Sequence, residues 1–432
     1  MVWRVTSRFR VRRSAADLDI PCFLYSVYLC IESIPYGFEI EGSMANPSTS
    51  VLAPGQVDQL SALVSGASFA GLATAYWMTK LGYRVTVIEL ASDLRRGGTP
   101  VDIEGETIEI LSRMGMMEAV RAKALPPRDF EFKDEADATL GGLEAASRPD
   151  DLSARRYEIH RDDLLDILFG AVDGSVETLF GRSLNQLEEG PAGVTVTFSD
   201  GSKGDYTLVF GCDGNRSNTR QLVFGDADSS SYFMGGYFYL RVVPETGLLP
   251  ANRTQVFSVP GLTAMLNGYD DRTDIALAFR SDRQIDYDYR DRAQQRRLIR
   301  GHFDGIGWKV PAMLAHVDTD GDFYFDQASQ IRMKSWSKGR VALVGDAGYC
   351  VSPVAGMGGS MALIGAARLA DALRRHPDDH AAAFREYEDR LRPFVEEVQE
   401  KAATDGMSFL FPADELELAE RNRKLLEGII DL

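Results

Sequence analysis

The sequence predicts an α/β protein in which a doubly wound domain of mainly parallel strands receives an inserted antiparallel sheet and ends in helices. Three observations support this fold class. A strand, a glycine-rich turn, a helix and a second strand follow one another between Gln59 and Glu89. Short strands rich in aromatic and β-branched residues fill 237–280, and the chain returns to a buried strand and a long apolar helix at 340–373.

The first domain is expected to open with a βαβ unit. Gln59–Val64 is a short apolar run, Leu72–Leu81 has the apolar spacing of a helix, and Arg84–Glu89 is a second strand. Helices are predicted next over Thr107–Met117 and Asp162–Phe169, and strands over Val194–Phe198 and Tyr206–Phe210, the latter two separated by the turn signal Ser199–Gly201.

The texture of the sequence then changes, which predicts a second lobe inserted into the first. Its expected strands are Tyr237–Val243, Thr254–Val259, Leu262–Leu266 and Ile275–Arg280. Arg340–Val344 is a strand again, and helices are predicted over Ser360–Leu373, Ala381–Gly406 and Glu415–Leu426. The predicted division is an extension (1–55), the first domain in two parts (56–230 and 336–378), the antiparallel-sheet domain (231–335) and C-terminal helices (379–432).

The first 55 residues differ from the rest. A stretch rich in Pro, Ser, Thr and Ala, Ala45–Gly55, is typical of a flexible lead-in. Met44 could be the true start, with the upstream part an artefact, or the whole segment could be an authentic addition that packs on the surface. The sequence leaves these alternatives open.

Composition and charge exclude several classes of function. The 47 Lys and Arg against 64 Asp and Glu give a net charge of −17, which repels nucleic acid and anionic membranes. No apolar run reaches the length of a membrane span, and the apolar run Ile20–Ile31 is too short and lacks the cleavage site of a secretory signal. Four cysteines without a C-x-x-C pair and five scattered histidines predict no metal site and a reducing, cytoplasmic location. A monomer and a homodimer are both compatible with this composition.

The first motif is a glycine-rich turn between the first strand and the first helix. It reads G-x-S-x-x-G from Gly66 through Ser68 to Gly71, one residue away from the Rossmann dinucleotide fingerprint. Gly66 makes the tight turn, Gly71 lets the helix pack close to the strand, and a small residue at 68 lets the backbone approach a pyrophosphate. A motif of this kind is weak by itself, since glycine-rich helix starts are common.

An acidic residue at the end of the second strand strengthens this interpretation. Glu89 lies 18 residues after Gly71, near the offset at which a carboxylate hydrogen-bonds a ribose hydroxyl and disfavours a 2′-phosphate. The site therefore suits FAD or NAD rather than NADP. The competing interpretation is an ordinary solvated carboxylate at a strand end.

Two further motifs follow strands. After Leu208–Phe210 come Asp213 and Gly214, then a polar stretch ending in Arg220, which could also be a plain strand-to-turn connection. After Arg340–Val344 come Gly345 and Asp346, then a loop with Pro353, Gly356, Gly358 and Gly359 that leads into the long helix. A carboxylate there can accept a hydrogen bond from a polyol, and backbone N–H groups at a helix N-terminus suit a ring that becomes negative on reduction.

In this order, the three motifs resemble the class A flavin-dependent monooxygenases, the para-hydroxybenzoate hydroxylase superfamily. The resemblance covers Leu60 to Arg392 and points to the shorter members, which include aromatic-polyketide hydroxylases and tetracycline-inactivating enzymes. It implies that the first domain binds FAD and that the antiparallel sheet belongs to the substrate domain. Ser68 in place of a second glycine, the run Met357–Ser360 and Cys350 depart from the common pattern, which leaves the subfamily and the substrate open.

The resemblance assigns cofactor residues by position. The first motif would bind the ADP part of FAD, the Asp-Gly motif would contact FAD and NAD(P)H, Asp346 would bind the ribityl chain, and the loop would line the isoalloxazine. Arg161, before an L-x-x-x-L helix, would contact the flavin linker, with a surface ion pair as its alternative role; Arg96 and Asp102 match a flavin-edge segment. The residues so assigned are Gly66, Ser68, Phe69, Ala70, Gly71, Glu89, Arg96, Asp102, Arg161, Asp213, Gly214, Arg220, Asp346, Pro353, Gly356, Gly358 and Gly359.

The reaction implied by the resemblance is hydroxylation. NADPH or NADH binds transiently and reduces FAD, O2 adds at C4a, and the hydroperoxide transfers one oxygen atom to an aromatic or polycyclic small molecule. No catalytic side chain follows from the sequence. A flavin-dependent reductase, a halogenase and a non-catalytic flavin-binding protein remain alternatives, although a single Trp308 replaces the halogenase signature W-x-W-x-I-P.

Aromatic residues of the inserted sheet suit a flat apolar substrate, although packing in a core is the commoner role of an aromatic on a strand. These residues are Phe233, Tyr237, Tyr239, Phe257, Phe323 and Phe325.

Overall fold

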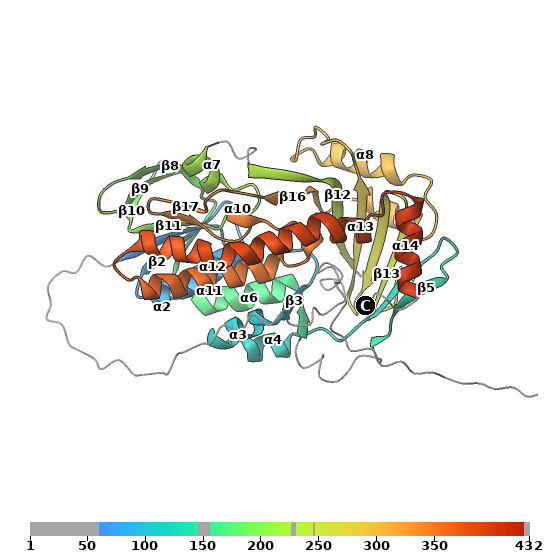
Figure 1. Cartoon of the computed structure of the whole chain (residues 1–432), viewed down its shortest axis with the longest axis horizontal. Coiled ribbons are helices and arrows are strands. Elements are labelled where there is room, and N and C mark those ends of the chain that lie inside the picture. The colour runs from blue at the N-terminus through green and yellow to red at the C-terminus, as the bar shows by residue number, and fades with distance from the viewer. Residues whose placement is uncertain (1–59, 146–155, 226–229, 245–246, 427–432) are drawn as a thin grey trace, which may run out of the picture.

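The computed structural model describes residues 60–145, 156–225, 230–244 and 247–426, which form two lobes lying side by side (Figure 1). One lobe is built on a parallel sheet and the other on an antiparallel sheet. The mixed α/β fold predicted from the sequence is confirmed. The predicted extension, 1–55, lies outside the described residues.

A six-stranded sheet forms the centre of the first lobe. Its order is β17-β18-β11-β1-β2-β7, and all neighbours run parallel except β17. The strands are β1 (Ser61–Ser65), β2 (Arg84–Glu89), β7 (Glu177–Phe180), β11 (Leu208–Gly211), β17 (Ser337–Lys338) and β18 (Val341–Leu343). β18 lies beside β11, so that Val209 pairs with Val341, 132 positions later in the sequence.

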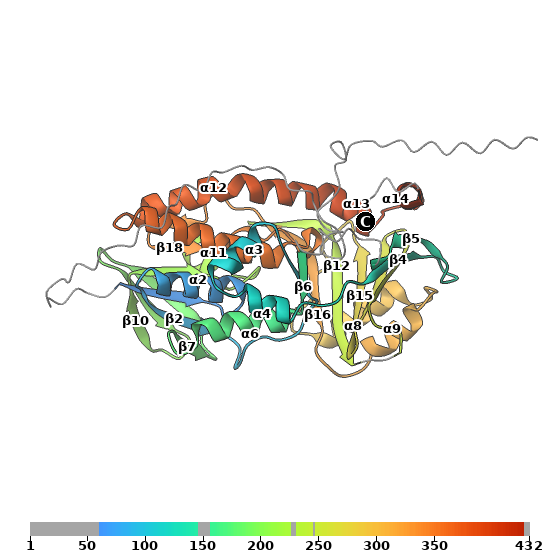
Figure 2. The same ribbon diagram turned by 90° about the horizontal axis from the view of Figure 1, so that it is seen from below.

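The two faces of this sheet are covered differently. Side chains alternate along β1: Ala62 and Val64 pack toward the helices, whereas Leu63 packs toward a three-stranded antiparallel sheet. The helical face carries α2 (Phe69–Lys80) and α11 (Gly358–Arg375), with α12 (His380–Lys401) lying along α11 (Figure 2). The small sheet consists of β8 (Leu184–Glu189), β9 (Val194–Phe198) and β10 (Lys203–Tyr206).

Shorter elements complete the first lobe. A two-stranded sheet pairs β3 (Val101–Glu104) with β6 (Arg156–Ile159). The helices are α3 (Glu106–Arg113), α4 (Met117–Ala122), α6 (Arg161–Val172), α7 (Asn218–Phe224), α10 (Asp346–Tyr349) and the 3-10 turn Pro353–Ala355.

Two predicted elements are divided in the structure. The helix predicted over Thr107–Met117 is interrupted between α3 and α4 by Gly115, whose φ of 75° is left-handed. The strand predicted over Tyr206–Phe210 changes sheets at Thr207, because β10 pairs with β9 whereas β11 pairs with β1.

The second lobe is a seven-stranded sheet of order β16-β12-β15-β14-β13-β4-β5. Its inserted strands are β12 (Ser231–Pro244), β13 (Arg253–Val259), β14 (Leu262–Gly268), β15 (Arg272–Arg280) and β16 (Tyr324–Ile331). The strands β4 (Asp129–Lys133) and β5 (Thr139–Leu143) fall in the range predicted for the first domain, yet β4 pairs in parallel with β13 and extends this sheet. Parallel pairing between segments so distant in the chain leaves no local signal in the sequence.

One face of the seven-stranded sheet packs against α8 (Arg292–Phe303) and α9 (Val310–Val317). All six aromatic residues considered for the substrate face lie in this second core, five of them buried and Phe233 packed at its edge. The structure therefore supports core packing, the commoner of the two roles that the sequence left open for them. The opposite face, which carries Met265 and Ala278, packs toward the first lobe.

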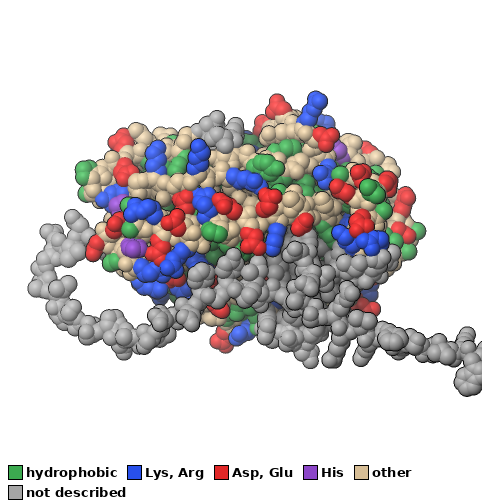
Figure 3. Space-filling model, in the orientation of Figure 1, with side chains coloured by type: hydrophobic (Ala, Val, Ile, Leu, Met, Phe, Trp, Pro, Cys, Tyr) green, Lys and Arg blue, Asp and Glu red, His purple; other side chains and the backbone are tan. Residues whose placement is uncertain are grey.

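The C-terminal segment connects the two lobes. From α12 the chain continues through the π-helical turn Ala402–Gly406 and α13 (Met407–Leu410) to α14 (Glu415–Leu426) on the second lobe (Figure 1). There the buried Arg421 donates a hydrogen bond from Nη1 to Ser258 Oγ at 3.0 Å. Acidic and basic side chains are interspersed over the face drawn in Figure 3. Among the helices described, none has the length and apolar character needed to cross a bilayer.

The close packing of α11 on α10 gives a stability prediction. A Cβ at Gly365 would lie 1.8 Å from Oη of Tyr349, which is buried and accepts a hydrogen bond from Tyr387 Oη at 2.9 Å. Overpacking of this kind costs roughly 1–3 kcal/mol, so Gly365→Ala is expected to lower the free energy of unfolding by that amount in urea titrations. Gly301→Ala in α8 is the matched control, because its Cβ would meet no described atom within 4 Å. Equal stability of Gly365→Ala and the wild type would contradict the prediction.

Candidate functional site

Four parallel strands bring the sequence motifs to one edge of the first-lobe sheet. Gly66 follows β1, Glu89 ends β2, the Asp-Gly motif follows β11, and Gly345 follows β18. Because the strands run parallel, all these carboxyl ends lie at the same edge, where ligands of such sheets bind. The structure therefore places three motifs that are distant in the sequence at a common site.

Backbone proximity fixes the glycines of the first turn. Gly66 has a φ of 108°, and a Cβ there would lie 2.5 Å from the carbonyl oxygen of Cys212, just before Asp213. A Cβ at Gly71 would lie 1.8 Å from the carbonyl oxygen of Gly66. Both distances are impossible for a side chain, so the turn and the start of α2 pack backbone to backbone, with the N-terminus of α2 directed at the site.

Glu89 lies beside this turn. Its carboxylate accepts hydrogen bonds from the backbone N–H of Ala67 and of Ala91, each at 2.9 Å. The carboxylate is thus held at the end of β2 next to the glycine turn, which is the placement that a ribose-binding acid requires. Its role in binding stays a prediction.

Arg161 joins the same group of residues. It begins α6, donates from Nη2 to Ser68 Oγ at 3.3 Å, and lies over the Phe69 ring at 5.4 Å. Its Nη1 donates to the carbonyl oxygen of Arg95 at 2.8 Å. Arg161 also forms a long ion pair with Asp162 at 3.8 Å, so the ion pair considered as its alternative role exists beside the contacts with Ser68 and Phe69.

Arg96 is the one predicted residue that turns away from the group. It forms a two-pronged ion pair with Asp166 at 2.8 and 3.0 Å, and both side chains are half exposed. Nothing in this placement favours a flavin contact for Arg96, although Gly98, two residues later, packs against Arg161.

The Asp-Gly motif connects parts of the site. Asp213 accepts hydrogen bonds from Ser217 Oγ and from the backbone N–H of Thr219, so it holds the first turn of α7. Arg220 is buried and donates from Nη1 to the carbonyl oxygen of Ala347, next to Asp346, at 2.8 Å. The second motif thereby positions the third.

The same loop reaches the second lobe through two residues that the sequence did not single out. Asn215 Nδ2 donates to Ser329 Oγ at 3.2 Å, and Arg216 pairs with Asp326 at 2.6 Å. Both partners lie on β16. No local pattern marks these residues, because their partners follow more than 100 positions later.

The third motif closes on the first. A Cβ at Gly345, whose φ is 68°, would lie 3.0 Å from the Cβ of Ala70. A Cβ at Gly359 would lie 3.4 Å from the Phe69 ring. The loop between them contains Pro353, which begins a 3-10 turn, and Gly356, which is left-handed. No described atom lies within 4 Å of the Cβ positions of Gly214 and Gly358, so these two glycines border open space.

Two carboxyl groups at the site are buried. Burial raises the pKa of Asp346 to about 6, opposed by a hydrogen bond with Cys350. Asp102 pairs with Arg156 at 2.9 Å through Oδ1, while its buried Oδ2 has no hydrogen-bond partner among the described residues. Arg156 was missed from the sequence because the β3–β6 pairing that brings it to Asp102 joins segments 54 residues apart.

These features fit FAD. The glycine turn leaves the room for a pyrophosphate that a Cβ would fill, Glu89 is held at the ribose position, and Asp346 is a buried carboxyl group able to accept from a polyol. The open space at Gly214 and Gly358 lies on the same loops.

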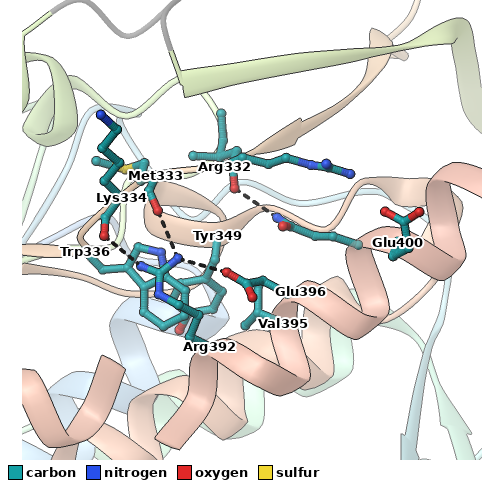
Figure 4. Close-up of a pocket in the computed structure, with 11 residues that line it drawn as sticks. Arg332, Met333, Lys334, Trp336, Tyr349, Arg392, Val395, Glu396 and Glu400 are labelled. Atoms are coloured by element: carbon teal, nitrogen blue, oxygen red, sulfur yellow. Dashed lines mark hydrogen bonds and ion pairs between the residues drawn. The ribbon is translucent and has the colours of Figure 1, made fainter. Parts of the chain in front are cut away.

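A cavity of about 510 Å³ lies away from these motifs, between α12 and the segment that follows β16 (Figure 4). Arg392 there donates to the carbonyl oxygens of Met333 and Lys334 and lies over the Trp336 ring at 4.5 Å. No residue lining this cavity carries a buried polar side-chain atom that lacks a partner within the described chain. It therefore offers no sign of a cofactor or substrate.

Comparison with known proteins identifies the family to which the chain is similar. The profile of the FAD binding domain family matches residues 59–240 and 306–402. An uncharacterized protein of Mycobacterium tuberculosis is 37% identical over 341 residues, which cover 78% of this chain and 91% of that protein. A flavin-dependent monooxygenase of Legionella longbeachae is 33% identical over 376 residues, covering 85% and 94%. The crystal structure of the tetracycline destructase Tet(51) is 32% identical, with a TM-score of 0.74, and covers 86% of this chain and 96% of its own.

The position of Glu89 predicts its effect on cofactor binding. Glu89→Gln keeps only one acceptor oxygen, so one backbone N–H loses a charge-assisted hydrogen bond worth about 1.5–3 kcal/mol. We expect FAD to bind the apoprotein about tenfold to a hundredfold more weakly, measured by quenching of flavin fluorescence. Glu118→Gln, on the exposed face of α4, should bind FAD as the wild type does. An unchanged affinity in Glu89→Gln would remove Glu89 from the site.

Asp346 predicts a pH dependence. Because burial raises the pKa of Asp346 to about 6, above the usual value near 3.9, the folded apoprotein favours its protonated form. The ionised group therefore costs stability as pH rises from about 4 to 6, and the full cost remains above 6. We expect apo Asp346→Asn to melt above the wild type at pH 8 and to match it at pH 4, while losing at least about tenfold in FAD affinity.

A control separates this effect from a general change in charge. Asp320→Asn alters an exposed carboxylate on the second lobe and should leave the difference in melting temperature independent of pH. A melting difference for Asp346→Asn that does not vary with pH would show that the carboxyl group titrates normally.

Proposed function

The chain belongs to the FAD binding domain family and is an FAD-dependent monooxygenase, and on that premise we propose that it uses NADPH or NADH to insert one oxygen atom into an aromatic or polycyclic small molecule. The observation that carries the proposal is the junction of three motifs. The turn of the first motif meets Cys212, Arg220 of the second holds Ala347, and Gly345 and Gly359 of the third meet Ala70 and Phe69. One continuous cradle results.

The residues of the chain divide the work of holding the cofactor. In this proposal the N-terminus of α2 faces the pyrophosphate, Glu89 accepts from the ribose and Asp346 accepts from the ribityl chain. When bound, the flavin would supply the redox chemistry that connects NAD(P)H oxidation to O2 activation. The protein orients the substrate and excludes water.

The substrate side of the proposal rests on the sheet face that packs toward the first lobe. Small and flexible side chains, Ala276, Ala278 and Met265, lie on this face beside Phe238, whereas the six aromatic residues considered from the sequence lie on the other face. One relative of known structure is named a tetracycline destructase, which favours a polycyclic substrate. Relatives named monooxygenases favour oxygen insertion over the reductase, halogenase and non-catalytic alternatives.

We extend the proposal to the location, the assembly and the physiological role of the protein. A cytoplasmic location agrees with Cys212 and Cys350, which are free and buried. A monomer and a homodimer are both compatible with this activity. The reaction would fit a biosynthetic role as well as a detoxifying one.

The test is an oxidation assay on the FAD-loaded protein with a panel of phenols and tetracyclic polyketides. We expect one or more ligands to accelerate NADPH or NADH oxidation and to yield a product heavier by one oxygen atom. Mass spectrometry after reaction under isotopically labelled O2 should place the label in that product. Ligand-stimulated oxidation that releases only hydrogen peroxide, or a product without labelled oxygen, would contradict the proposal.

A further inference from the structure

Two buried glutamines contact the loop that follows Asp346. Gln330 lies on β16 and Gln399 lies on α12, and neither residue is more than 4% exposed. Neither belongs to the three motifs. Their amides meet the chain just before the 3-10 turn Pro353–Ala355, in the middle of the predicted flavin loop (residues 346–359).

Each amide makes two hydrogen bonds to backbone carbonyl groups. Gln399 donates from Nε2 to the carbonyl oxygens of Ile331 and Cys350, at 2.9 and 3.0 Å. Gln330 donates from Nε2 to the carbonyl oxygens of Val351 and Gln399, at 3.3 and 2.7 Å. Each nitrogen thus uses both of its hydrogens, which fixes the orientation of both amides. The two glutamines are joined to each other and to the flavin loop.

A third side chain orients Gln330. Arg332 donates from Nε and Nη2 to Gln330 Oε1 at 2.9 and 2.7 Å. The flavin loop is also bound to this strand through its backbone, because the Ile331 N–H donates to the Cys350 carbonyl oxygen at 3.0 Å. Buried polar groups whose hydrogen bonds are made favour one arrangement of the chain. The segment before Ser352 is therefore held from β16 and from α12 together.

Ser352, which follows these carbonyl groups, has a strained backbone. Its φ of 81° and ψ of 149° are a combination that is essentially reserved for glycine. It also precedes Pro353, and residues before proline prefer an extended backbone with negative φ. Ser352 is buried, and its Oγ accepts a hydrogen bond from the Val354 N–H at 3.3 Å. A conformation of this kind persists only where the surrounding structure imposes it.

The flavin loop is attached on both sides of this strained residue. Before it, Arg220 donates to the carbonyl oxygen of Ala347. After it, the turn Pro353–Ala355 packs against α12 and against the π-helical turn Ala402–Gly406. Single π-helical turns are rare and are frequently found at functional sites. The two glutamine amides lie between these attachments, next to the strained backbone.

We propose that Gln330 and Gln399 are positioning residues of the cofactor site, whose amides keep Ser352 in its strained conformation and so shape the flavin loop for FAD before FAD binds. The inference rests on the proposed placement of Asp346 and the flavin loop at the flavin. A loop that is ordered in advance loses less conformational entropy on binding, which raises the affinity. Without the amides, Ser352 would relax toward the extended backbone that is normal before proline, and FAD would have to reorder the loop.

The test removes the donors of Gln399 at nearly constant shape. Gln399→Met keeps the length and flexibility of the side chain but cannot hydrogen-bond the two carbonyl groups. We expect the apoprotein of the full chain to bind FAD at least about tenfold more weakly, measured by quenching of flavin fluorescence. The visible circular dichroism of the FAD-saturated variant should also differ from that of the wild type, because this signal depends on how the protein holds the isoalloxazine.

Leu391→Ala is the matched control on the same helix. Leu391 is buried in the core two turns before Gln399, and its side chain offers no donor to the flavin loop. The cavity left by the substitution should lower the free energy of unfolding in urea titrations. FAD affinity and visible circular dichroism should stay as in the wild type. Equal weakening of FAD binding in Leu391→Ala and Gln399→Met would show a general loosening of α12 and overturn the inference.

Two further variants test the strain and the amide network. Glycine adopts the φ of Ser352 without steric cost, so Ser352→Gly combined with Gln399→Met should bind FAD at least about threefold more tightly than Gln399→Met alone. Arg332→Met changes an exposed side chain, leaves the core intact and removes the donors that orient Gln330. It should weaken FAD binding about threefold.

The outcomes separate this inference from the proposed function, because FAD binding is measured without substrate or oxygen. Wild-type affinity in Gln399→Met overturns the inference, and so does a double variant that binds no more tightly than Gln399→Met. If Gln399→Met yields no folded apoprotein, wild-type affinity in Arg332→Met overturns it instead. Weak binding by Asp346→Asn together with wild-type binding by Gln399→Met would overturn this inference alone, whereas wild-type binding by both would also overturn the proposed placement of the flavin.

Discussion

The site depends on one constraint, the approach of backbone to backbone where the first strand ends. At Gly66 and Gly71 the chain comes closer to itself and to Cys212 than any side chain allows. Hydrogen bonds on either side of this point, from Gly66 N–H to Ile88 and from Cys212 N–H to Ser65, bind the ends of β1, β2 and β11 together. Because this corner is rigid, Glu89, Ser68 and Asp213 acquire fixed positions around it.

A few polar contacts connect this corner to the rest of the site. Arg220 hydrogen-bonds the Gly-Asp loop, Asn215 hydrogen-bonds the antiparallel sheet, and Arg216 forms an ion pair with it. Side chains of one short loop thus hold the second lobe in position relative to the predicted flavin site.

Much of the first lobe could be predicted from the sequence, because its signals are local. Strand β2 was predicted with its observed ends, and the glycines at 66 and 71 were predicted for the steric reason that the structure shows. The spacing of apolar residues and the turn residues could not reveal that Asp129–Leu143 joins the other lobe, or that Arg156 would form an ion pair with Asp102. Both depend on strand pairing between distant segments. The aromatic strands were found, but alternation has two solutions, and only the packing of α8 and α9 decides which face they take.

The insertion of the antiparallel sheet between β11 and β18 has a consequence for how the chain is made. The central sheet lacks β18, and α2 lacks its neighbour α11, until residues 341–375 have been synthesised. During translation the apolar face formed by Ala62, Val64 and Phe210 carries α2 but neither α11 nor α12, while the second lobe can already pair its own strands. A ribosome-bound chain that ends before α11 therefore exposes aggregation-prone apolar surface, which chaperones that bind the nascent chain would have to protect.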